Sequence, residues 1–333
     1  MSKASGFQYT KTPLRFVMNY KDGGWDEGHL SSDETIVLNE SACVLQYGQS
    51  VFEGLKAYRT KDGKIVCFRP DLNAKRLADS CIRMKMPPVS EEKFLEAIKA
   101  VILANEDLIP SYGEGGSLYL RPFVIGTNPV LGVKPASEYQ FRVFACPVSS
   151  YFNGEAKPLN LRVSDLDRAA SHGTGHIKAA LNYAMSLFNI SEAHELGYDE
   201  NVYLDSATHT YVEETGGANI LFVTKDGSIV TPKSDTILPS ITRRSLLVLA
   251  KDYLGINVEE RRIDIKEING FKECALCGTA SVLSPVGSID NHGDIAKFES
   301  VGKDSVMTKL RELLLSIQYC DTKAPKGWIY EIK

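Results

Sequence analysis

A turn-rich segment, SSYFNGEAKPLN, lies near the middle of the chain at residues 149–160. Clusters of Gly, Pro, Ser and Asn mark loops, and loops of this composition often separate domains. The stretches on its two sides are comparable in length. We therefore predict two domains, at residues 1–150 and 159–333, joined by a loop at residues 151–158.

Both halves alternate strand-like with helix-like stretches. Hairpins are predicted where β-prone arms flank an Asp-Gly pair, at residues 56–70 and 218–232. Helical spacing of apolar residues predicts helices at residues 72–84 with Asp71 as N-cap, at 91–108, and up to Leu254. The alternation predicts an α/β fold (α+β by some schemes).

Charge and composition exclude several classes of function. The net charge of −4 comes from 38 basic and 42 acidic residues, so no nucleic-acid partner is expected. No apolar run approaches the roughly 20 residues that cross a bilayer. The N-terminus lacks the apolar stretch of a secretory signal, and the seven cysteines are odd in number and scattered. We expect a cytoplasmic protein with reduced thiols and no membrane association.

The lysine in GTGHIKAALNYA, Lys178, follows a glycine-rich turn and precedes a helical pattern expected to bury Leu181, Met185 and Phe188. Tyr183 lies five positions on, and side chains five apart on a helix point in different directions. If both meet one ligand, Lys178 must lie in the turn, where the glycines are expected to adopt unusual backbone angles. Such a lysine can attack a carbonyl, and the aldehyde of pyridoxal phosphate is the obvious one. The alternative is a surface lysine.

An acidic residue in the second half could serve the same cofactor. Glu214 comes just before Gly216-Gly217. A carboxylate at this position could keep a pyridine nitrogen protonated, which makes the ring an electron sink. The alternative is a solvated turn residue.

Several separated motifs resemble one family. Residues 212–244 resemble the signature of class IV, fold-type IV pyridoxal-phosphate aminotransferases in seven positions: Glu214, Asn219, Thr231, Leu238, Ser240, Ile241 and Arg243. The stretches at residues 47–77, 117–133, 173–184 and 277–286 are similar to branched-chain amino-acid aminotransferases. The resemblance runs from about residue 7 to residue 319.

The resemblance implies a two-domain fold-type IV structure, a homodimer and a ping-pong exchange of the amino group. The substrates it implies are Leu, Ile and Val with 2-oxoglutarate, giving branched-chain 2-oxo acids and glutamate. The cofactor would contact Lys178 as the Schiff-base lysine, Tyr183 at the ring oxygen, Glu214 at the ring nitrogen, and Arg76, Ile241, Thr242 and Thr279 at the phosphate. Free N–H groups at the start of a helix, as expected at Ile241 and Thr242, bind a phosphate dianion well.

The resemblance also implies a largely aromatic substrate pocket. Its expected lining is Phe7, Tyr47, Phe52, Tyr119 and Tyr151, with Arg121 for the far carboxylate of glutamate and the N–H groups of Thr279 and Ala280 for the α-carboxylate. Tyr119 and Arg121 are two apart on one predicted strand, so they share a face. Core packing is the alternative for each aromatic residue, and a solvated helix arginine is the alternative for Arg76.

The chain departs from the family pattern in three ways: a redox Cys-x-x-Cys is missing, Gly217 replaces a residue that is often threonine, and Leu221 replaces an aromatic residue. Ser281 and Ser284 stand where some members have a redox Cys-x-x-Cys, so no such switch is expected. Cys274 and Cys277 are read as buried small residues, and no metal site is predicted. Two rivals remain open: a D-amino-acid aminotransferase or aminodeoxychorismate lyase of the same fold, and a non-catalytic cofactor-binding or structural protein.

Overall fold

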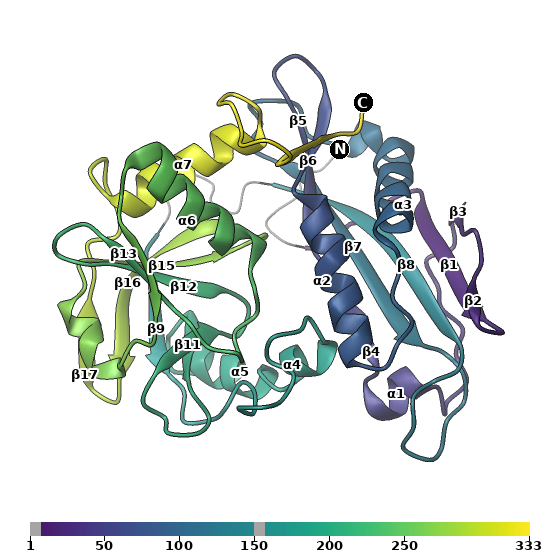
Figure 1. Cartoon of the computed structure of the whole chain (residues 1–333), viewed down its shortest axis with the longest axis horizontal. Helices are drawn as coiled ribbons and strands as arrows, with labels where there is room; N and C mark the ends of the chain where they lie inside the picture. The colour runs from purple at the N-terminus through teal and green to yellow at the C-terminus, as the bar shows by residue number, and fades with distance from the viewer. Residues whose placement is uncertain (1–7, 150–156) are drawn as a thin grey trace. The chain divides into compact units, whose positions relative to one another are not determined.

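The structure is a computed structural model that describes residues 8–149 and 157–333. It has the mixed α/β class that the sequence predicts. The chain forms two compact units (Figure 1). The first comprises Met1–Tyr151, Ile177–Leu181 and Ile317–Lys333, and the second comprises Phe152–His176 and Asn182–Ser316.

The first unit is built on a nine-stranded antiparallel sheet in the order β18-β6-β5-β7-β8-β1-β2, with β3 on β1 and β4 on β7. Its strands are β1 (Arg15–Lys21), β2 (Gly24–Trp25), β3 (His29–Ser31), β4 (Ser50–Phe52), β5 (Leu55–Arg59), β6 (Ile65–Phe68), β7 (Ser117–Gly126), β8 (Tyr139–Val148) and β18 (Ile329–Glu331). Its helices are α1 (Cys43–Tyr47), α2 (Pro70–Arg83), α3 (Glu91–Ala104) and the 3₁₀ helix η1 (Glu106–Leu108). The predicted hairpin at residues 56–70 is confirmed as β5 and β6, with Gly63 at φ 84° in its turn.

A two-residue break separates β4 from β5 along one edge of the long strand β7. Both strands pair with β7 in one continuous register, and Pro122 lies opposite the break. The carbonyl of Pro122 accepts from Glu53 N at 2.7 Å. The absent N–H of Pro122 points to this same side, where the break leaves no regular ladder bond to lose. Glu53 therefore lies between two strands rather than within one.

Helices α2 and α3 lie side by side on one face of this sheet (Figure 1). The prediction of Asp71 as N-cap is wrong, since α2 begins at Pro70 after Arg69, which is left-handed at φ 49°. Proline fits the first helical position because it has no N–H to satisfy there. The expected helix at residues 91–108 ends early at Ala104, because the Asn105 side chain bonds to the backbone of Leu14 and the chain tightens into η1.

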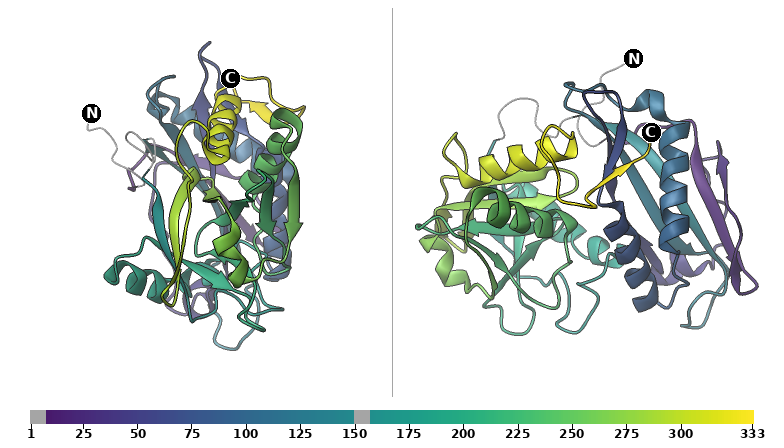
Figure 2. Two further views of the ribbon diagram at one scale, coloured as in Figure 1. Left: turned by 90° about the vertical axis from the view of Figure 1, so that its left-hand side faces the viewer. Right: turned by 45° about the horizontal axis from the view of Figure 1, so that its top comes forward.

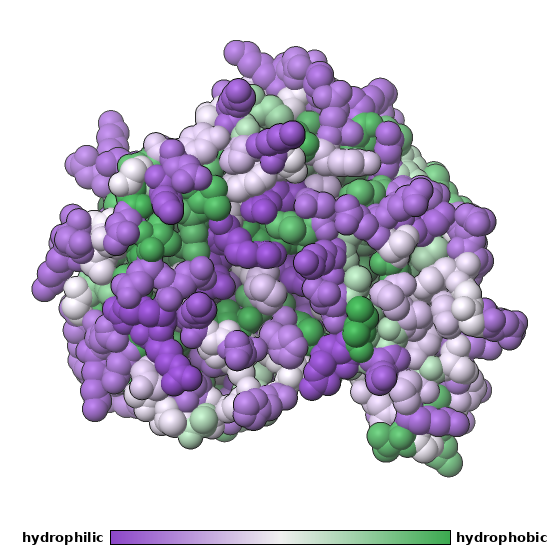
Figure 3. All heavy atoms as spheres, in the orientation of Figure 1, coloured by the Kyte–Doolittle hydropathy of each residue, from purple (hydrophilic) through white to green (hydrophobic). Residues whose placement is uncertain are grey.

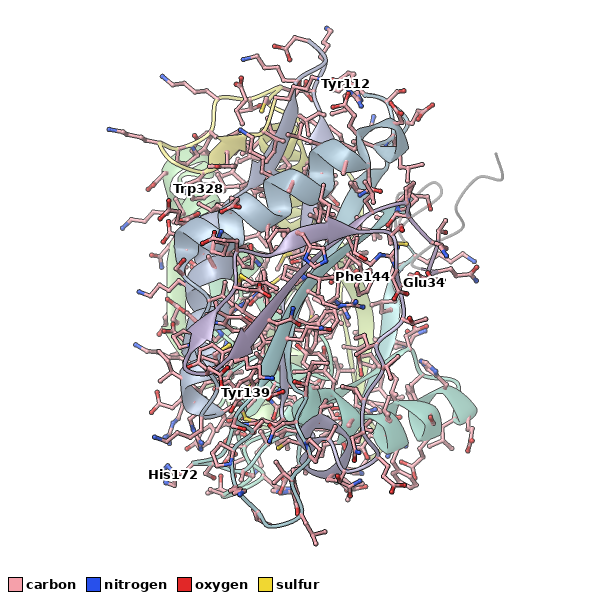
Figure 4. All side chains as sticks on the ribbon, turned by 90° about the vertical axis from the view of Figure 1, so that its right-hand side faces the viewer. Glu34, Tyr112, Tyr139, Phe144, His172 and Trp328 are labelled. Carbon is pink, nitrogen blue, oxygen red and sulfur yellow. The ribbon has the colours of Figure 1, made fainter. Side chains whose placement is uncertain are left out.

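The core of the first unit fills the space between its sheet and helices. Leu77, Phe94, Ile98 and Phe141 are fully buried in it. The C-terminal strand β18, yellow in Figure 2, lies beside β6. Trp328, labelled in Figure 4, packs edge-on against Phe68 just before that strand. The last residues of the chain thus complete the sheet of the first unit.

The second unit has a mixed sheet in the order β11-β10-β9-β16-β15-β12-β13-β14, with β17 on β16. Its strands are β9 (Leu159–Val163), β10 (Glu200–Leu204), β11 (Val212–Thr215), β12 (Asn219–Val223), β13 (Ile229–Pro232), β14 (Val258–Arg261), β15 (Glu273–Gly278), β16 (Val282–Asn291) and β17 (Asp294–Lys297). Its helices are α4 (Ala180–Ala184), α5 (Leu187–Glu195), α6 (Ile241–Leu254), α7 (Val306–Gln318) and the 3₁₀ helix η2 (Ile265–Gly270). Residues 180–181 of α4 and 317–318 of α7 are assigned to the first unit. The predicted hairpin at residues 218–232 is confirmed as β12 and β13.

The helix expected after Lys178 is instead two short helices, α4 and α5. The Ser186 hydroxyl bonds to the Asn182 carbonyl and Ser186 N bonds to the Tyr183 carbonyl, which tightens the chain and separates them. The prediction that Met185 and Phe188 are buried is wrong: they are 53% and 68% exposed. Helix α5 buries polar Asn189 and Ala193 instead.

Candidate active site

Lys178 lies in the turn before α4, where the sequence analysis placed it. Its backbone N–H donates to Ser80 Oγ of α2 at 3.1 Å, and its carbonyl accepts from Phe52 N at 3.0 Å. The side chain is half-buried, and its Nζ lies 4.8 Å from the centroid of the Phe52 ring. A solvated surface lysine needs no such fixed backbone and aromatic floor, so the structure favours the functional interpretation.

The Phe52 ring also holds Arg121. The guanidinium carbon of Arg121 lies 4.8 Å from the Phe52 centroid and 5.4 Å from that of Tyr119, and Arg121 donates to the Tyr119 hydroxyl at 3.0 Å. The expectation that Tyr119 and Arg121 share a face is confirmed. Tyr119 fits closely against the chain at Gly54, where a Cβ would lie 2.1 Å from its hydroxyl. The first unit therefore brings four predicted residues together: Phe52, Tyr119, Arg121 and Lys178.

Arg76 is buried in a network that the sequence did not reveal. Its Nε donates to Glu53 Oε1 at 2.7 Å and its second terminal nitrogen to Glu53 Oε2 at 2.8 Å. Asn73 donates to the same carboxylate at 2.7 Å, and Glu53 is completely buried. A bidentate pair of this kind fixes the plane of the guanidinium. Arg76 is therefore not a solvated helix arginine.

Ser80 connects Arg76 to Lys178. The Ser80 hydroxyl donates to the Arg76 carbonyl at 2.7 Å and accepts from Lys178 N. Both bonds use one buried hydroxyl on α2. Glu53, helix α2 and the segment at Lys178 thus form one connected set in the first unit.

Of the other three expected pocket aromatics, Tyr47 alone lies among the described residues. Tyr47, on α1, is 38% exposed, and its hydroxyl donates to the carbonyl of Leu131 in the loop between β7 and β8. That loop carries Leu131 and Val133 at 89% and 88% exposure, and Figure 3 shows apolar residues at its tip. Phe7 and Tyr151 lie outside the described residues.

Glu214 is buried in the second unit, on β11. Its Oε2 accepts from Asn219 Nδ2 at 2.6 Å, its Oε1 accepts from Leu238 N at 2.8 Å, and the same Oε1 forms an ion pair with a terminal nitrogen of Arg168 at 2.6 Å. Burial raises the pKa of the Glu214 carboxyl, and the charge of Arg168 opposes that shift. The alternative of a solvated turn residue is excluded, since Glu214 is only 3% exposed.

Arg168 connects Glu214 to the glycine-rich turn. The terminal nitrogen that pairs with Glu214 also donates to the carbonyls of Gly175 at 3.1 Å and Thr236 at 2.8 Å. A Cβ at Gly175 would lie 2.2 Å from the Thr236 carbonyl oxygen. The expectation of unusual backbone angles is wrong here, because neither Gly173 nor Gly175 has a positive φ. At Gly175 a glycine is required for close approach instead.

The proposed phosphate residues of the second unit lie at two turns. Helix α6 begins at Ile241 behind Ser240, whose hydroxyl accepts from Arg243 N at 3.1 Å. The cap satisfies the third N–H, and those of Ile241 and Thr242 precede it in the first turn. Thr279 and Ala280 form the turn between β15 and β16, and a Cβ at Gly278 would be 3.9 Å from the Gly217 carbonyl. Tyr183 lies on α4, partly exposed.

Comparison with known proteins supplies the family. A family model described as class IV aminotransferase matches residues 50–289. The chain is 50% identical over 332 residues to the branched-chain-amino-acid aminotransferase of Helicobacter pylori, covering 99% of this chain and 97% of that protein. The chain belongs to the class IV aminotransferase family.

Solved structures of class IV aminotransferases share its fold. The Escherichia coli branched-chain amino acid aminotransferase has a TM-score of 0.82 and 28% identity, with 97% of this chain and 100% of that chain covered. The Thermobaculum terrenum branched-chain amino acid aminotransferase, solved in its PLP form, has a TM-score of 0.81 and covers 97% and 100%. At 24% identity, that second likeness is one of fold.

The residues of this class IV aminotransferase suit the chemistry of pyridoxal phosphate. A primary amine lies on an aromatic ring, a carboxyl with a raised pKa is buried, and a buried arginine and a helix N-terminus carry the positive charge that favours a dianion. The buried atoms Arg168 Nε and Asn219 Oδ1, in the two side chains that bond to Glu214, lack a protein partner among the described residues. Polar atoms of this kind are expected near a polar ligand or ordered water.

Two cysteines of this class IV aminotransferase lie buried on one strand. Cys274 and Cys277 are fully buried on β15, as predicted. Burial raises the pKa of the Cys277 thiol to about 12 and that of Cys274 well above its usual value. A thiol that stays protonated is a poor nucleophile and a poor metal ligand. No helix in the described part of the chain is long and apolar enough to cross a membrane.

Proposed function

We propose that the chain transfers the amino group of the branched-chain L-amino acids Leu, Ile and Val to 2-oxoglutarate. The observation that carries this proposal is the full-length similarity to branched-chain aminotransferases, in a chain whose Lys178, Phe52, Tyr119 and Arg121 form one cluster. The products are branched-chain 2-oxo acids and L-glutamate.

The cofactor is pyridoxal 5′-phosphate, which when bound supplies an aldehyde for the amine and a ring that withdraws electrons. Lys178 would hold it through Nζ, and its freed amine would move a proton from Cα of the amino acid. The Glu214 carboxylate would accept a hydrogen bond from the protonated ring nitrogen and stabilise its charge, and Tyr183 would bond to the ring oxygen. Arg76, the first turn of α6 and Thr279 bind the phosphate, because a guanidinium and helix N–H groups both favour a dianion.

The substrate is held by apolar rings and by one arginine. Phe52, Tyr119 and Tyr47 favour a branched aliphatic side chain by burying its surface, at roughly 25 cal/mol per Å². Phe7 and Tyr151 are proposed to line the same pocket. Arg121 takes the far carboxylate of glutamate, and Thr279 and Ala280 take the α-carboxylate with their N–H groups. One pocket thereby serves both half-reactions.

A homodimer is proposed as the working form. The support is apolar exposure: Leu131 and Val133 on the β7–β8 loop, and Met185, Leu187 and Phe188 on and beside α5, are each more than half exposed. Contiguous exposed apolar side chains commonly mark protein interfaces. Light scattering of the purified protein tests this, and an active monomer at nanomolar concentration would contradict it.

A substrate panel tests the proposed reaction. The purified protein with its cofactor is mixed in single turnover with L-Leu, L-Ile, L-Val, L-Glu, D-Ala and aminodeoxychorismate. We expect conversion of the four L-amino acids, and no conversion by the Lys178→Ala variant, which should still fold. Preferred turnover of D-Ala or release of an aminobenzoate would support a rival activity of the same fold. Failure to bind the cofactor at all would support the structural rival, and binding without conversion of any substrate would support a non-catalytic cofactor-binding protein.

A further inference from the structure

One buried amide in the second unit bonds twice to the same residue of the glycine-rich turn. Asn182 Oδ1 accepts from the Thr174 hydroxyl at 2.7 Å, and Asn182 Nδ2 donates to the Thr174 carbonyl at 2.8 Å. Asn182 is only 3% exposed. The two residues are eight positions apart in the sequence, and Lys178 lies between them.

The direction of the two bonds is determined by chemistry. A backbone carbonyl can only accept, so the NH₂ end of the amide must face it. The oxygen end then faces the hydroxyl, which can donate. Both ends of the amide are matched to Thr174, and a rotated amide would place two acceptors against each other.

Helix propensity alone does not explain an asparagine at this position. Asn182 is the third residue of α4, and asparagine disfavours a helix interior because its side chain competes for backbone bonds. Alanine would stabilise the helix better. The side chain therefore stabilises something outside the helix, and the turn at Thr174 is what it contacts.

The neighbouring residue of the turn is held from the other side. Arg168 donates to the Gly175 carbonyl, and Gly175 lies against the Thr236 carbonyl with no room for a Cβ. Two consecutive residues are thus fixed by two side chains, one from before the turn and one from after it. The short segment from His176 to Leu181 therefore begins after Gly175 and ends before Asn182, and both of these flanking residues are held by the bonds described above.

We propose that Asn182 is a positioning residue: through Thr174 it closes the segment that carries Lys178 and keeps the amine in place while it is detached. The inference rests on the proposed role of Lys178 but assigns a role to a residue outside that chemistry. Lys178 must return to one position in both half-reactions. An anchored segment makes that return an intrinsic property of the chain rather than of the ligand.

Hydrogen exchange of the cofactor-free protein tests the anchor directly. In Asn182→Ala, amides of residues 173–181 are expected to exchange about tenfold faster, because two hydrogen bonds are lost. Asn182→Asp should behave similarly, since its carboxylate faces the Thr174 carbonyl. Thr174→Ser keeps both bonds and should remain at wild-type rates, whereas Thr174→Val loses the hydroxyl bond and should be intermediate.

Asn189→Ala is the matched control. Asn189 is equally buried, lies on α5 and donates to the Tyr203 hydroxyl at 3.0 Å, with no bond to the turn. It should leave exchange in residues 173–181 unchanged. The same increase in both variants, or no increase in Asn182→Ala, would overturn the proposal.

Kinetics give a second readout. With the cofactor bound, Asn182→Ala should lower kcat roughly 10- to 100-fold in both half-reactions with little change in KM, because a displacement of about 1 Å can cost 10²-fold. Thr174→Ser should retain wild-type kcat. A changed KM with unchanged kcat would contradict the role. If the substrate panel fails while exchange changes selectively, the proposed reaction is wrong but the anchor stands.

Discussion

Among the described residues, each unit buries one arginine–glutamate pair, and the residue proposed to contact the ligand differs between the two pairs. In the first unit, Glu53 holds Arg76 in a bidentate pair, with Asn73 as a third partner. In the second, Arg168 contacts Glu214, with Asn219 as a third partner. The proposed ligand contact is the arginine in one pair and the glutamate in the other.

The difference shows what a buried partner is for. A lone buried charge is costly, so each functional group needs an opposite charge that does not compete for the ligand. Glu53 accepts two hydrogen bonds from one edge of the Arg76 guanidinium, which has five N–H donors in all. Arg168 instead contacts one oxygen of Glu214 and donates to two backbone carbonyls, so it only partly offsets the effect of burial on that carboxyl.

The largest effect is expected at the functional end of the second pair. Glu214→Gln keeps the hydrogen-bonding shape but cannot hold a ring nitrogen protonated. The value of kcat should fall by about 10²–10⁴, as is typical for a lost proton-positioning group, while cofactor still binds. Glu213→Gln is the control, because this buried neighbour on β11 bonds to Ser234 and Thr236 instead. Equal losses in both variants would count against the role of Glu214.

In the first pair, removal of the supporting residue Glu53 is expected to lower the free energy of unfolding. Glu53→Ala leaves the Arg76 guanidinium buried without its partner, which typically costs about 3–5 kcal/mol of unfolding free energy. The double change Glu53→Met with Arg76→Met should recover most of that stability, because both charges are removed together. Urea unfolding measures it.

The double variant also separates stability from ligand binding. It should stay weak in cofactor affinity, because the proposed phosphate contact is gone. Wild-type cofactor affinity in the double variant would show that Arg76 is structural, and only the second pair would then contain a ligand contact.

The residues that support the proposed ligand contacts, Glu53 and Arg168, could not be identified from the sequence. Lys178, Arg76 and Glu214 belong to local motifs, and the hairpins follow from Asp-Gly turns. Glu53 and Arg168 act through partners that are 23 and, by subtraction, 46 positions away, and no spacing rule links them. Partner choice of this kind depends on how the break between β4 and β5 and the turn at Gly175 pack.

Helix boundaries failed for related reasons. The run after Lys178 has apolar residues at helical spacing, but Met185 and Phe188 are exposed and the buried face carries Asn189. Spacing predicts that a face exists, and tertiary contacts decide which face is buried. At Gly175 the glycine was correctly singled out, but for backbone freedom rather than for the space that a Cβ would take.

Arg168→Met should change how the unfolding free energy depends on pH. The pKa of Glu214 is already raised by burial, and loss of Arg168 removes the charge that opposes the shift. A group with a raised native pKa binds more protons in the native state, so unfolding free energy falls as pH rises from the ordinary glutamate pKa to the native one. In the variant this fall should extend to higher pH, by at most about 1.4 kcal/mol per pH unit.

Unfolding of the cofactor-free protein across pH measures this slope. Adding Glu214→Gln to Arg168→Met should abolish the extended fall, since the titrating group is gone. If Glu214→Gln leaves the slope unchanged, another group causes the pH dependence, and Arg168 does not act on the pKa of Glu214.

A third arginine, Arg121, differs from Arg76 and Arg168, because no carboxylate pairs with it among the described residues. It is held by the rings of Phe52 and Tyr119 and by the Tyr119 hydroxyl. Aromatic faces position a guanidinium without neutralising it, so its charge stays available to a substrate carboxylate. Arg121→Leu should slow the half-reaction with L-glutamate roughly tenfold more than that with L-leucine, which has no second carboxylate to lose a charge-assisted bond. Single-turnover rates for the two amino acids decide it: equal losses would make Arg121 a packing residue like its neighbours, and glutamate would then be recognised by another group.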